Sequence, residues 1–338
     1  MEYSFASENF APVHPAILQA IADANQFHDF SYGADQISER VNVLLREHFG
    51  QRVDVYFAYN GTGANNFSLS VITQPCAAVF CTDVSHLYVD ESTAPETFTG
   101  CRLSPVLSIH GKMIFEELVK AVKRMNSIHN PVPGVVTITQ PTEYGTIYSV
   151  DEIKLIARFC RDNGMSLHMD GARYFNAAAA LHVPLGYFTY NTGVDVLTLG
   201  GTKNGMMFGE AVLFFSDKGR ERRKYQLKRS MQMSSKTRFI AAQFEALMTN
   251  DLWRDLAGHA NSMAVIFESE IRNKSNLVVT HPVETNAVFL KMDEEMYQRL
   301  NAWVPFYRWG HGTGEVRIMF SHDIKEQEIH RFIYKMKQ

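Results

Sequence analysis

The chain has 338 residues, a length that predicts about two domains and a core that needs no disulfide bonds. Hydrophobic residues make up 46% and charged residues 20%, which excludes fibrous and low-complexity chains. Lys and Arg total 33 against 36 Asp and Glu, so the formal charge of −3 provides no basic surface for nucleic acid or an anionic membrane.

The sequence predicts a cytoplasmic protein with no membrane partner. Its first ten residues lack a basic apolar leader, so we expect no signal peptide, and no stretch approaches the ~18 apolar residues of a membrane span. We expect reduced thiols because the cysteines include no Cys-x-x-Cys pair; they are Cys76, Cys81, Cys101 and Cys160.

Short β-rich runs alternate with helical stretches through most of the chain. We expect strands over residues 53–59, 77–81, 134–139, 166–169, 194–199 and 211–215. Between them we expect helices over residues 64–73, 115–125 and 149–160. This alternation indicates an α/β domain with a mostly parallel sheet covered on both faces.

The pattern changes toward the end of the chain. The basic residues 218–228 predict the start of a long helix between domains, although such a run also fits a solvated helix face. Beyond residue 250 we expect a smaller α+β domain, with a helix over 253–271, strands over 277–280, 286–292 and 315–320, and a final helix. The expected division is an N-terminal segment 1–15, a large α/β domain 16–245 and a small domain 246–338.

Three polar loops follow expected strands, over residues 60–63, 170–173 and 200–204. Ligands of parallel sheets bind outside the carboxyl ends of the strands. We therefore expect the functional site where these loops meet.

Lys203 lies in the last loop, within Gly200-Gly201-Thr202-Lys203-Asn204-Gly205. Glycines let the backbone approach a ligand closely, and a lysine amine can form a Schiff base with a carbonyl compound such as pyridoxal phosphate. Taken alone, an ordinary loop lysine is the simpler explanation.

Asp170 stands at the end of an earlier strand. A carboxylate there can pair with a protonated pyridine nitrogen, so that the ring draws electrons from a bond breaking at the substrate α-carbon. The alternative is an N-cap of the helix that starts near Ala172.

Gly61, Thr62 and Gly63 lie between a strand and a helix, where backbone N–H groups bind phosphate and Thr62 adds a hydroxyl. The alternative is a plain turn set by Asn60-Gly61. A phosphate loop, then an aspartate after a strand, then a lysine among glycines is the order of a pyridoxal-phosphate enzyme with the aspartate-aminotransferase fold.

Over nearly its whole length the sequence resembles the L-threonine aldolases and related β-eliminating lyases, which are fold-type I pyridoxal-phosphate enzymes. The most specific match is the run HMDGARYFNAA at residues 168–178. Further matches follow in the family's order: residues 5–9, Tyr32-Gly33, residues 60–65, His86 with Asp90-Glu91, Thr285-Asn286 and residues 316–318.

The resemblance implies roles for the matching residues at the cofactor. Lys203 would form the Schiff base, and Asp170 would partner the pyridine nitrogen. His86 would stack on the ring close to the substrate's β-hydroxyl, which makes it the candidate base. The other residues implied at the cofactor are Gly61, Thr62, Gly63, Arg173, Thr202 and Lys228.

The resemblance also implies the substrate contacts. Ser7, Arg173 and Arg317 would bind the substrate carboxylate, for which a guanidinium offers two hydrogen bonds in one plane. Arg317 stands between two apolar strand residues, so it must point opposite to them, toward solvent or a cleft. Tyr32 is placed with the substrate, and Tyr32 and Lys228 would reach the site of a neighbouring subunit in a homodimer or homotetramer.

Three segments depart from the family. Thr202 replaces the usual serine before the lysine, and Asn204-Gly205-Met206-Met207 follows it. Residues 230–236 replace a glycine-rich segment, and residues 140–145, QPTEYG, replace the usual Glu-Asn-Thr. These departures leave the cofactor chemistry intact and the substrate's side chain open.

The predicted activity is cleavage of an L-β-hydroxy-α-amino acid, such as L-threonine or L-allo-threonine, to glycine and an aldehyde with pyridoxal phosphate as cofactor. The partner is a small amino acid, and no metal site is predicted. The alternatives are a β-eliminating lyase, an aminotransferase or a non-catalytic protein that binds the cofactor.

Overall fold

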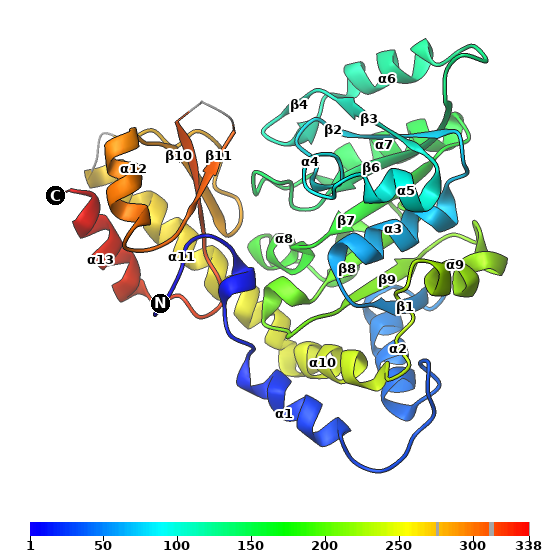
Figure 1. Ribbon diagram of the computed structural model, residues 1–338, viewed down its shortest axis with the longest axis horizontal. Helices are drawn as coiled ribbons and strands as arrows, with labels where there is room; N and C mark the ends of the chain where they lie inside the picture. Colours follow the sequence, from blue (N-terminus) through cyan, green and yellow to red (C-terminus); the bar gives the residue numbers. More distant parts are fainter. Residues whose placement is uncertain (275–276, 311–313, 338) are drawn as a thin grey trace.

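The computed structural model describes residues 1–274, 277–310 and 314–337, which form a large and a small unit (Figure 1). The helices of the large unit are α1 Pro15–Ala24, α2 Gln36–Phe49, α3 Gly61–Ile72, α4 His86–Val89, α5 Ala94–Thr99, α6 Phe115–Arg124, α7 Val150–Asp162, α8 Tyr174–Ala180, α9 Arg223–Arg229 and α10 Arg238–Met248. Its main strands are β1 Asp54–Ala58, β2 Ala77–Thr82, β3 Arg102–Val106, β6 Val132–Thr139, β7 Ser166–Gly171, β8 Val196–Gly200 and β9 Glu210–Phe214, and Ser108–Ile109 and Lys112–Met113 form a small hairpin, β4–β5.

The seven main strands form one sheet in the order β1-β9-β8-β7-β6-β2-β3. The pairs from β8 to β3 are parallel, whereas β9 runs antiparallel to β8 and β1. All residues of β2, β7, β8 and β9 are buried, as expected for a sheet that helices cover on both faces. The predicted mostly parallel α/β sheet is therefore confirmed.

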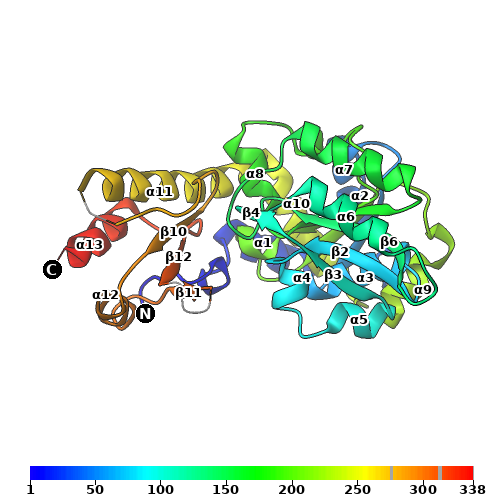
Figure 2. The same cartoon turned by 90° about the horizontal axis from the view of Figure 1, so that it is seen from above.

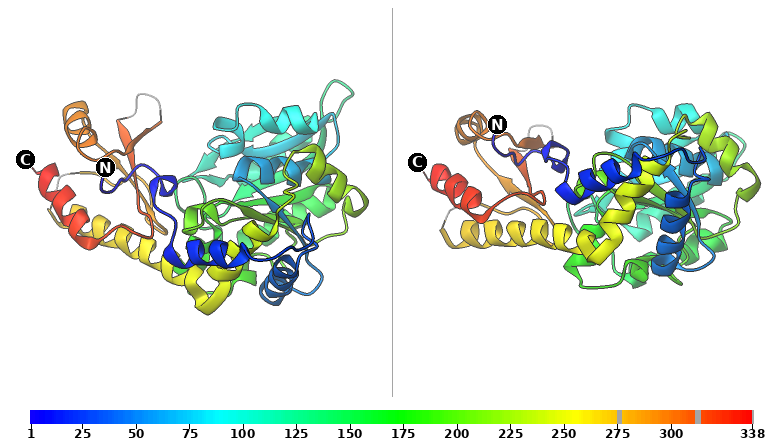
Figure 3. Two further views of the ribbon diagram at one scale, coloured as in Figure 1. Left: turned by 60° about the horizontal axis from the view of Figure 1, so that its bottom comes forward. Right: turned by 90° about the horizontal axis from the view of Figure 1, so that it is seen from below.

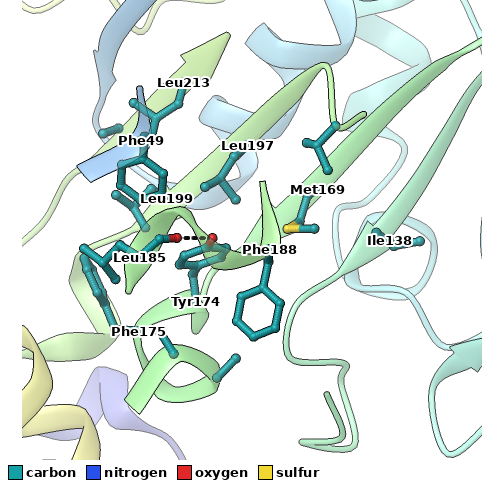
Figure 4. Packing of buried hydrophobic residues seen from close by; sticks show 14 of the residues in the cluster. Phe49, Ile138, Met169, Tyr174, Phe175, Leu185, Phe188, Leu197, Leu199 and Leu213 are labelled. Carbon is teal, nitrogen blue, oxygen red and sulfur yellow. Dashed lines mark hydrogen bonds between the residues drawn. The ribbon is translucent and has the colours of Figure 1, made fainter. Parts of the chain in front are cut away.

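Side chains that alternate along the strands pack into two separate cores. Val79, Val135 and Val196 pack with α3 on one face. Their neighbours Phe80, Val136 and Leu197 pack on the opposite face. Figure 2 shows α3 and α5 on one side of the sheet and α7 and α8 on the other. The second core is seen in Figure 4, where Tyr174 donates a hydrogen bond of 2.5 Å to the carbonyl of Leu185.

Local sequence signals explain where two helices begin. Asn60 accepts a hydrogen bond from the N–H of Gly63 and caps α3. Ser149 and Glu152 form a capping box at the start of α7. The predicted helix over 64–73 therefore begins earlier, at Gly61, and the one over 149–160 is confirmed.

The small unit is built on an antiparallel sheet in the order β10-β12-β11. Its elements are α11 Leu252–Lys274, β10 Ala287–Lys291, α12 Glu294–Asn301, β11 Tyr307–Trp309, β12 Glu315–Met319 and α13 Glu326–Met336. Within the predicted strand 277–280, Val279 forms an isolated bridge with Leu290 instead of a strand. The N-terminal segment lies against this unit (Figure 3), where Phe5 enters its core and accepts a hydrogen bond from the N–H of Met319.

The long helix between the two units is α11, not the basic segment 218–228. Trp253 at its start packs in the core of the large unit, and Phe267 packs in the core of the small one. The division at residue 245 stays a prediction, because the two cores meet partway along α11. The basic segment forms a 3-10 turn and the short α9, and Arg223 is buried there against Phe214 with an ion pair to Asp54, instead of facing solvent. Across the described residues, no helix is both long and apolar enough to cross a membrane.

Candidate active site

Loops at the carboxyl ends of the sheet strands meet the N-terminal segment and the small unit around a cleft of about 320 Å³. Most of the residues singled out from the sequence line it: Ser7, Gly61, Thr62, His86, Asp170, Arg173, Lys203 and Arg317. Tyr32, Gly63, Thr202 and Lys228 are not among its lining residues. The structure therefore brings together residues spread over more than 300 positions of the chain.

Asp170 ends β7 and is almost fully buried at the floor of the cleft. Its Oδ1 accepts a hydrogen bond from the N–H of Ala172 at 2.9 Å, as the N-cap alternative suggested. Its Oδ2 accepts one from Asn65 Nδ2, also at 2.9 Å. Both interactions fix the carboxylate while its surface still lines the cleft.

Lys203 lies on a short 3-10 turn after β8. Burial and the charge of Arg173 lower the pKa of its amine. In the part of the chain that the structure describes, Lys203 Nζ takes part in no hydrogen bond. A buried amine with a lowered pKa and no such partner is the state in which lysine is nucleophilic.

Thr202 supports this turn and does not face the cleft. Its hydroxyl donates to Glu210 Oε1 at 2.9 Å and accepts from the N–H of Gly209 at 3.1 Å. Glu210 Oε2 also accepts from the N–H of Gly201, and burial raises the pKa of Glu210 to about 8. The family resemblance implied that Thr202 contacts the cofactor, and these hydrogen bonds do not favour that contact.

The N-terminus of α3 presents Gly61 and Thr62 to the cleft. No heavy atom lies within 4 Å of where a Cβ of Gly61 would stand, so this position is open to a ligand. Gly63 is turned the other way, because a Cβ there would collide with the side chain of Gln232 at 2.2 Å. The divergent segment 230–236 thus packs against the predicted phosphate loop.

His86 begins α4 and is held by two glutamates. Its Nδ1 lies 2.9 Å from Glu91 Oε1, and this hydrogen bond raises the pKa of the imidazole. Its backbone N–H donates to Glu143 Oε1 at 3.0 Å. Asn65 Nδ2 donates to Glu91 Oε1 at 3.1 Å as well as to Asp170. The Asn65 amide therefore connects Asp170, the candidate partner of the pyridine nitrogen, with Glu91, the partner of His86.

The two cleft arginines differ in what they already bind. Arg173 donates to both oxygens of Glu8, at 2.5 and 2.8 Å, so the carboxylate it holds in this structure is one of the protein's own. Arg317 lies 4.6 Å from the ring centroid of Trp309 and donates one hydrogen bond to the carbonyl of Ala6. Its buried Nε has no partner among the described residues. Arg317 is therefore the freer of the two for a substrate carboxylate.

Tyr32 and Lys228 lie together outside the cleft. The ammonium of Lys228 stands 5.6 Å from the ring centroid of Tyr32, whose side chain is exposed. The N–H of Tyr32 donates to the carbonyl of Ser235 in the divergent segment. Ser7, in contrast, lies in the cleft, where its hydroxyl caps the N–H of Asn9.

Four residues of the site were not singled out from the sequence: Glu8, Asn65 and Glu210, which are buried, and Glu143, which is half-buried. Each bonds to a residue that was singled out, or to its support. Glu8 and Asn65 lie inside motifs that matched the family, which was the available signal. Glu143 and Glu210 had no such signal, since an isolated glutamate in a loop or strand is uninformative until its burial is known.

The donor set of the cleft fits pyridoxal phosphate. It has an unbonded buried amine, a fixed buried carboxylate, and an open helix N-terminus of the kind that binds phosphate. Over residues 1–274, 277–310 and 314–337, no group of three or more His, Cys, Asp or Glu side chains is arranged to hold a metal ion.

Glu8 provides a prediction on stability. Burial alone would raise its pKa, but Arg173 outweighs burial and, with the charge of Lys203 and the hydrogen bond from Asn286, lowers it from 4.5 to about 2. Ionised Glu8 then stabilises the fold by about 3 kcal/mol. This contribution is complete above pH 4.5 and is lost as the pH falls toward 2.

We therefore expect Glu8→Gln to lower the free energy of unfolding at pH 7, with a difference from wild type that narrows as the pH falls from 4.5 toward 2. Urea unfolding at a series of pH values measures it. A difference that stays constant over this range would show that the charge of Glu8 is not the cause.

Comparisons with known proteins show the family of the chain and its fold. Residues 4–295 match the family model of the β-eliminating lyases. The low-specificity L-threonine aldolase of a Pseudomonas species is 39% identical over 327 residues, covering 96% of this chain and 94% of its own. A structure of threonine aldolase from Leishmania major matches with a TM-score of 0.93 at 28% identity, covering 99% of this chain and 98% of that one. An Escherichia coli methionine aminotransferase, at 14% identity and a TM-score of 0.76, shares the fold.

Proposed function

Since the chain belongs to the β-eliminating lyase family, we propose that it is a pyridoxal-phosphate lyase that cleaves L-threonine or L-allo-threonine to glycine and acetaldehyde. The observation that carries this proposal is that Lys203, Asp170 and the His86–Glu91 pair, from three separate loops, line one cleft. The high identity to low-specificity L-threonine aldolases supports the choice of reaction within the family.

When bound, pyridoxal phosphate supplies an electron sink for the bond that breaks at the substrate α-carbon. Lys203 would attach it, Asp170 would hold its pyridine nitrogen in the protonated form, and the N-terminus of α3 at Gly61 and Thr62 would bind its phosphate. Asp170 suits this role because its two hydrogen bonds keep it in place without neutralising its charge.

Arg317 would bind the substrate carboxylate and so fix which α-carbon bond stands perpendicular to the cofactor ring. Burial lowers the pKa of its guanidinium to about 10, so it is still a cation at neutral pH. Arg317 lines the cleft and donates a single hydrogen bond among the described residues, so its guanidinium has N–H groups left for a carboxylate. Arg173 would contribute through its charge and its hold on Glu8.

His86 would take the proton of the β-hydroxyl. With Nδ1 bound to Glu91, the neutral ring carries its proton on Nδ1 and its lone pair on Nε2. Glu91 also raises the pKa of His86, so the base form increases as the pH rises through that value. The rate of cleavage is therefore expected to increase with pH over this range.

A panel of amino acids with identified products tests the proposed function. Glycine and acetaldehyde from L-threonine or L-allo-threonine, with D-threonine inert, would support it. A 2-oxo acid with ammonia would indicate an eliminating lyase instead. Lack of turnover of any β-hydroxy amino acid, with the cofactor bound to Lys203, would favour the aminotransferase or the binding protein.

Variants of Arg317 and His86 are expected to affect different kinetic constants. Arg317→Ala removes a carboxylate contact and should mainly raise KM, by about 10- to 100-fold. His86→Ala removes the base and should mainly lower kcat, by about 100-fold. Steady-state kinetics with L-threonine separates the two effects, and an unchanged kcat for His86→Ala would remove it from the proton transfer.

We further propose a cytoplasmic homodimer or homotetramer. The exposed side chains of Phe27, Phe30 and Tyr32, of which Tyr32 lies beside Lys228, support a subunit contact at this surface. Light scattering after size-exclusion chromatography tests it, and a monomer at micromolar concentration would refute it.

A further inference from the structure

Trp309 lines the cleft, and its place on the small sheet explains why it meets Arg317. It belongs to the edge strand β11, which pairs with β12. In that pair Tyr307 stands opposite Arg317, and Trp309, two residues further, stands opposite Glu315. Alternate residues of a strand point to the same face, so Trp309 and Arg317 are diagonal neighbours on one face of the sheet.

Arg317 lies over the rings of two aromatic residues of β11. Its guanidinium carbon is 4.6 Å from the ring centroid of Trp309 and 5.6 Å from that of Tyr307. Such a contact joins a positive charge to the face of a ring, and indole gives the strongest attraction among the aromatic side chains. We therefore expect Trp309, the nearer of the two, to be the stronger restraint on Arg317.

This restraint leaves hydrogen-bond donors of Arg317 available. A guanidinium has several N–H donors, and a contact with the face of a ring occupies none of them. Among the described residues Arg317 donates one hydrogen bond, of 3.0 Å, to the carbonyl of Ala6. Arg173, in contrast, donates to both oxygens of Glu8. The indole ring can therefore hold Arg317 in place without competing with a substrate carboxylate.

The ring of Trp309 is itself fixed by the packing around it. It meets Phe289 of β10 with 5.5 Å between ring centroids and Tyr144 of the large unit with 6.1 Å, in both cases edge to face. Tyr144 belongs to the segment 140–145, which departs from the family, and stacks on His281 with 3.9 Å between centroids. The contact with Tyr144 anchors the indole ring to the large unit, which carries the other side of the cleft.

We propose that Trp309 is a positioning residue for Arg317, whose guanidinium it holds at the place where the substrate carboxylate binds. The inference rests on the proposed function, because it assumes an amino acid in the cleft. Without the indole ring, the long side chain of Arg317 gains rotamers that the carboxylate would have to restrict on binding, which costs affinity. Trp309 itself takes no part in bond breaking.

Binding of L-alanine and of L-alaninamide to the holoenzyme, followed by the absorbance of the bound cofactor, tests this role. The two ligands differ in the carboxylate, which an uncharged amide replaces in alaninamide. Wild type should prefer alanine, and Arg317→Ala should lose most of this preference. Trp309→Ala should reduce the preference by roughly tenfold and leave the affinity for alaninamide unchanged.

A conservative variant and a matched control make the result specific to the ring face. Trp309→Phe keeps an aromatic ring and should retain more of the preference than Trp309→Ala. Trp303→Ala is the control, because Trp303 belongs to the same small unit and stacks on Phe332 but is not among the residues that line the cleft. Its preference for alanine should equal that of wild type.

A double variant tests whether Trp309 acts through Arg317. In Arg317→Ala the guanidinium that the ring would hold is absent, so the further change Trp309→Ala should leave the remaining preference as it is. Steady-state kinetics with L-threonine gives a second measurement, in which Trp309→Ala should raise KM by roughly tenfold and change kcat by less than about twofold.

The outcomes separate the two proposals. If wild type yields glycine from L-threonine but Trp309→Ala keeps the full preference for alanine, or lowers it further in the Arg317→Ala background, the role of Trp309 is refuted and the proposed function stands. An equal loss of affinity for alanine and alaninamide, or a lost preference in Trp303→Ala, would show a general structural effect and overturn the inference. If wild type neither binds nor cleaves amino acids, both proposals fail.

Discussion

Lys203→Ala is expected to abolish covalent attachment of pyridoxal phosphate and to lower turnover by on the order of 10⁴-fold. The amine is buried, its pKa is lowered by burial and by Arg173, and no hydrogen bond competes for it in the described chain. Other lysines cannot replace it, because Lys203 is the lysine that lines the described part of the cleft.

Borohydride reduction followed by peptide mapping measures the attachment. In wild type the pyridoxyl group should be found on Lys203, and the variant should carry none. Lys112→Ala is the control, since Lys112 forms an ion pair with Glu152 away from the cleft and its loss should leave the label in place. Label on another lysine of the wild-type protein would refute the assignment.

The fold and the reaction class could be predicted because their signals are local. Each of these signals lies within a few residues of the chain. They are the glycines around Lys203, the buried strand before Asp170 and the turn at Gly61. Strand patterns predicted the mostly parallel sheet, and short motifs of this kind predicted that the functional site lies at the carboxyl ends of its strands. The fold class, and the family and lyase activity that the resemblance to the threonine aldolases implied, agree with the comparisons.

Contacts between distant residues could not be predicted in the same way. The contact of Arg173 with the substrate carboxylate stays a prediction, and the sequence did not show that Nε and one terminal nitrogen of its guanidinium donate to Glu8, 165 positions away. Nothing in a single sequence shows that the N-terminal segment folds back to the cleft. Likewise the charge of residues 218–228 suggested a long helix, whereas burial of Arg223 depends on Asp54 of a distant strand.

The second prediction with a large expected effect concerns Asp170, which belongs to a network of hydrogen bonds that reaches His86. Its carboxylate is held by the N–H of Ala172 and by Asn65, and Asn65 also holds Glu91, the partner of His86. Loss of the Asp170 charge would therefore act on the cofactor directly, while loss of its shape would also disturb His86. An isosteric and a truncating variant distinguish the two effects.

We expect Asp170→Asn to fold normally and to turn over L-threonine ~100- to 1000-fold more slowly, because an amide cannot keep the pyridine nitrogen protonated. Asp170→Ala should lose at least as much activity and, in addition, bind the cofactor weakly and change the pH profile that depends on His86. Cofactor titration and pH-rate profiles measure both, with Asp195→Asn, a carboxylate at the opposite end of β7, as control. Near-normal turnover of Asp170→Asn at full cofactor occupancy would show that the negative charge of Asp170 is not what activates the ring.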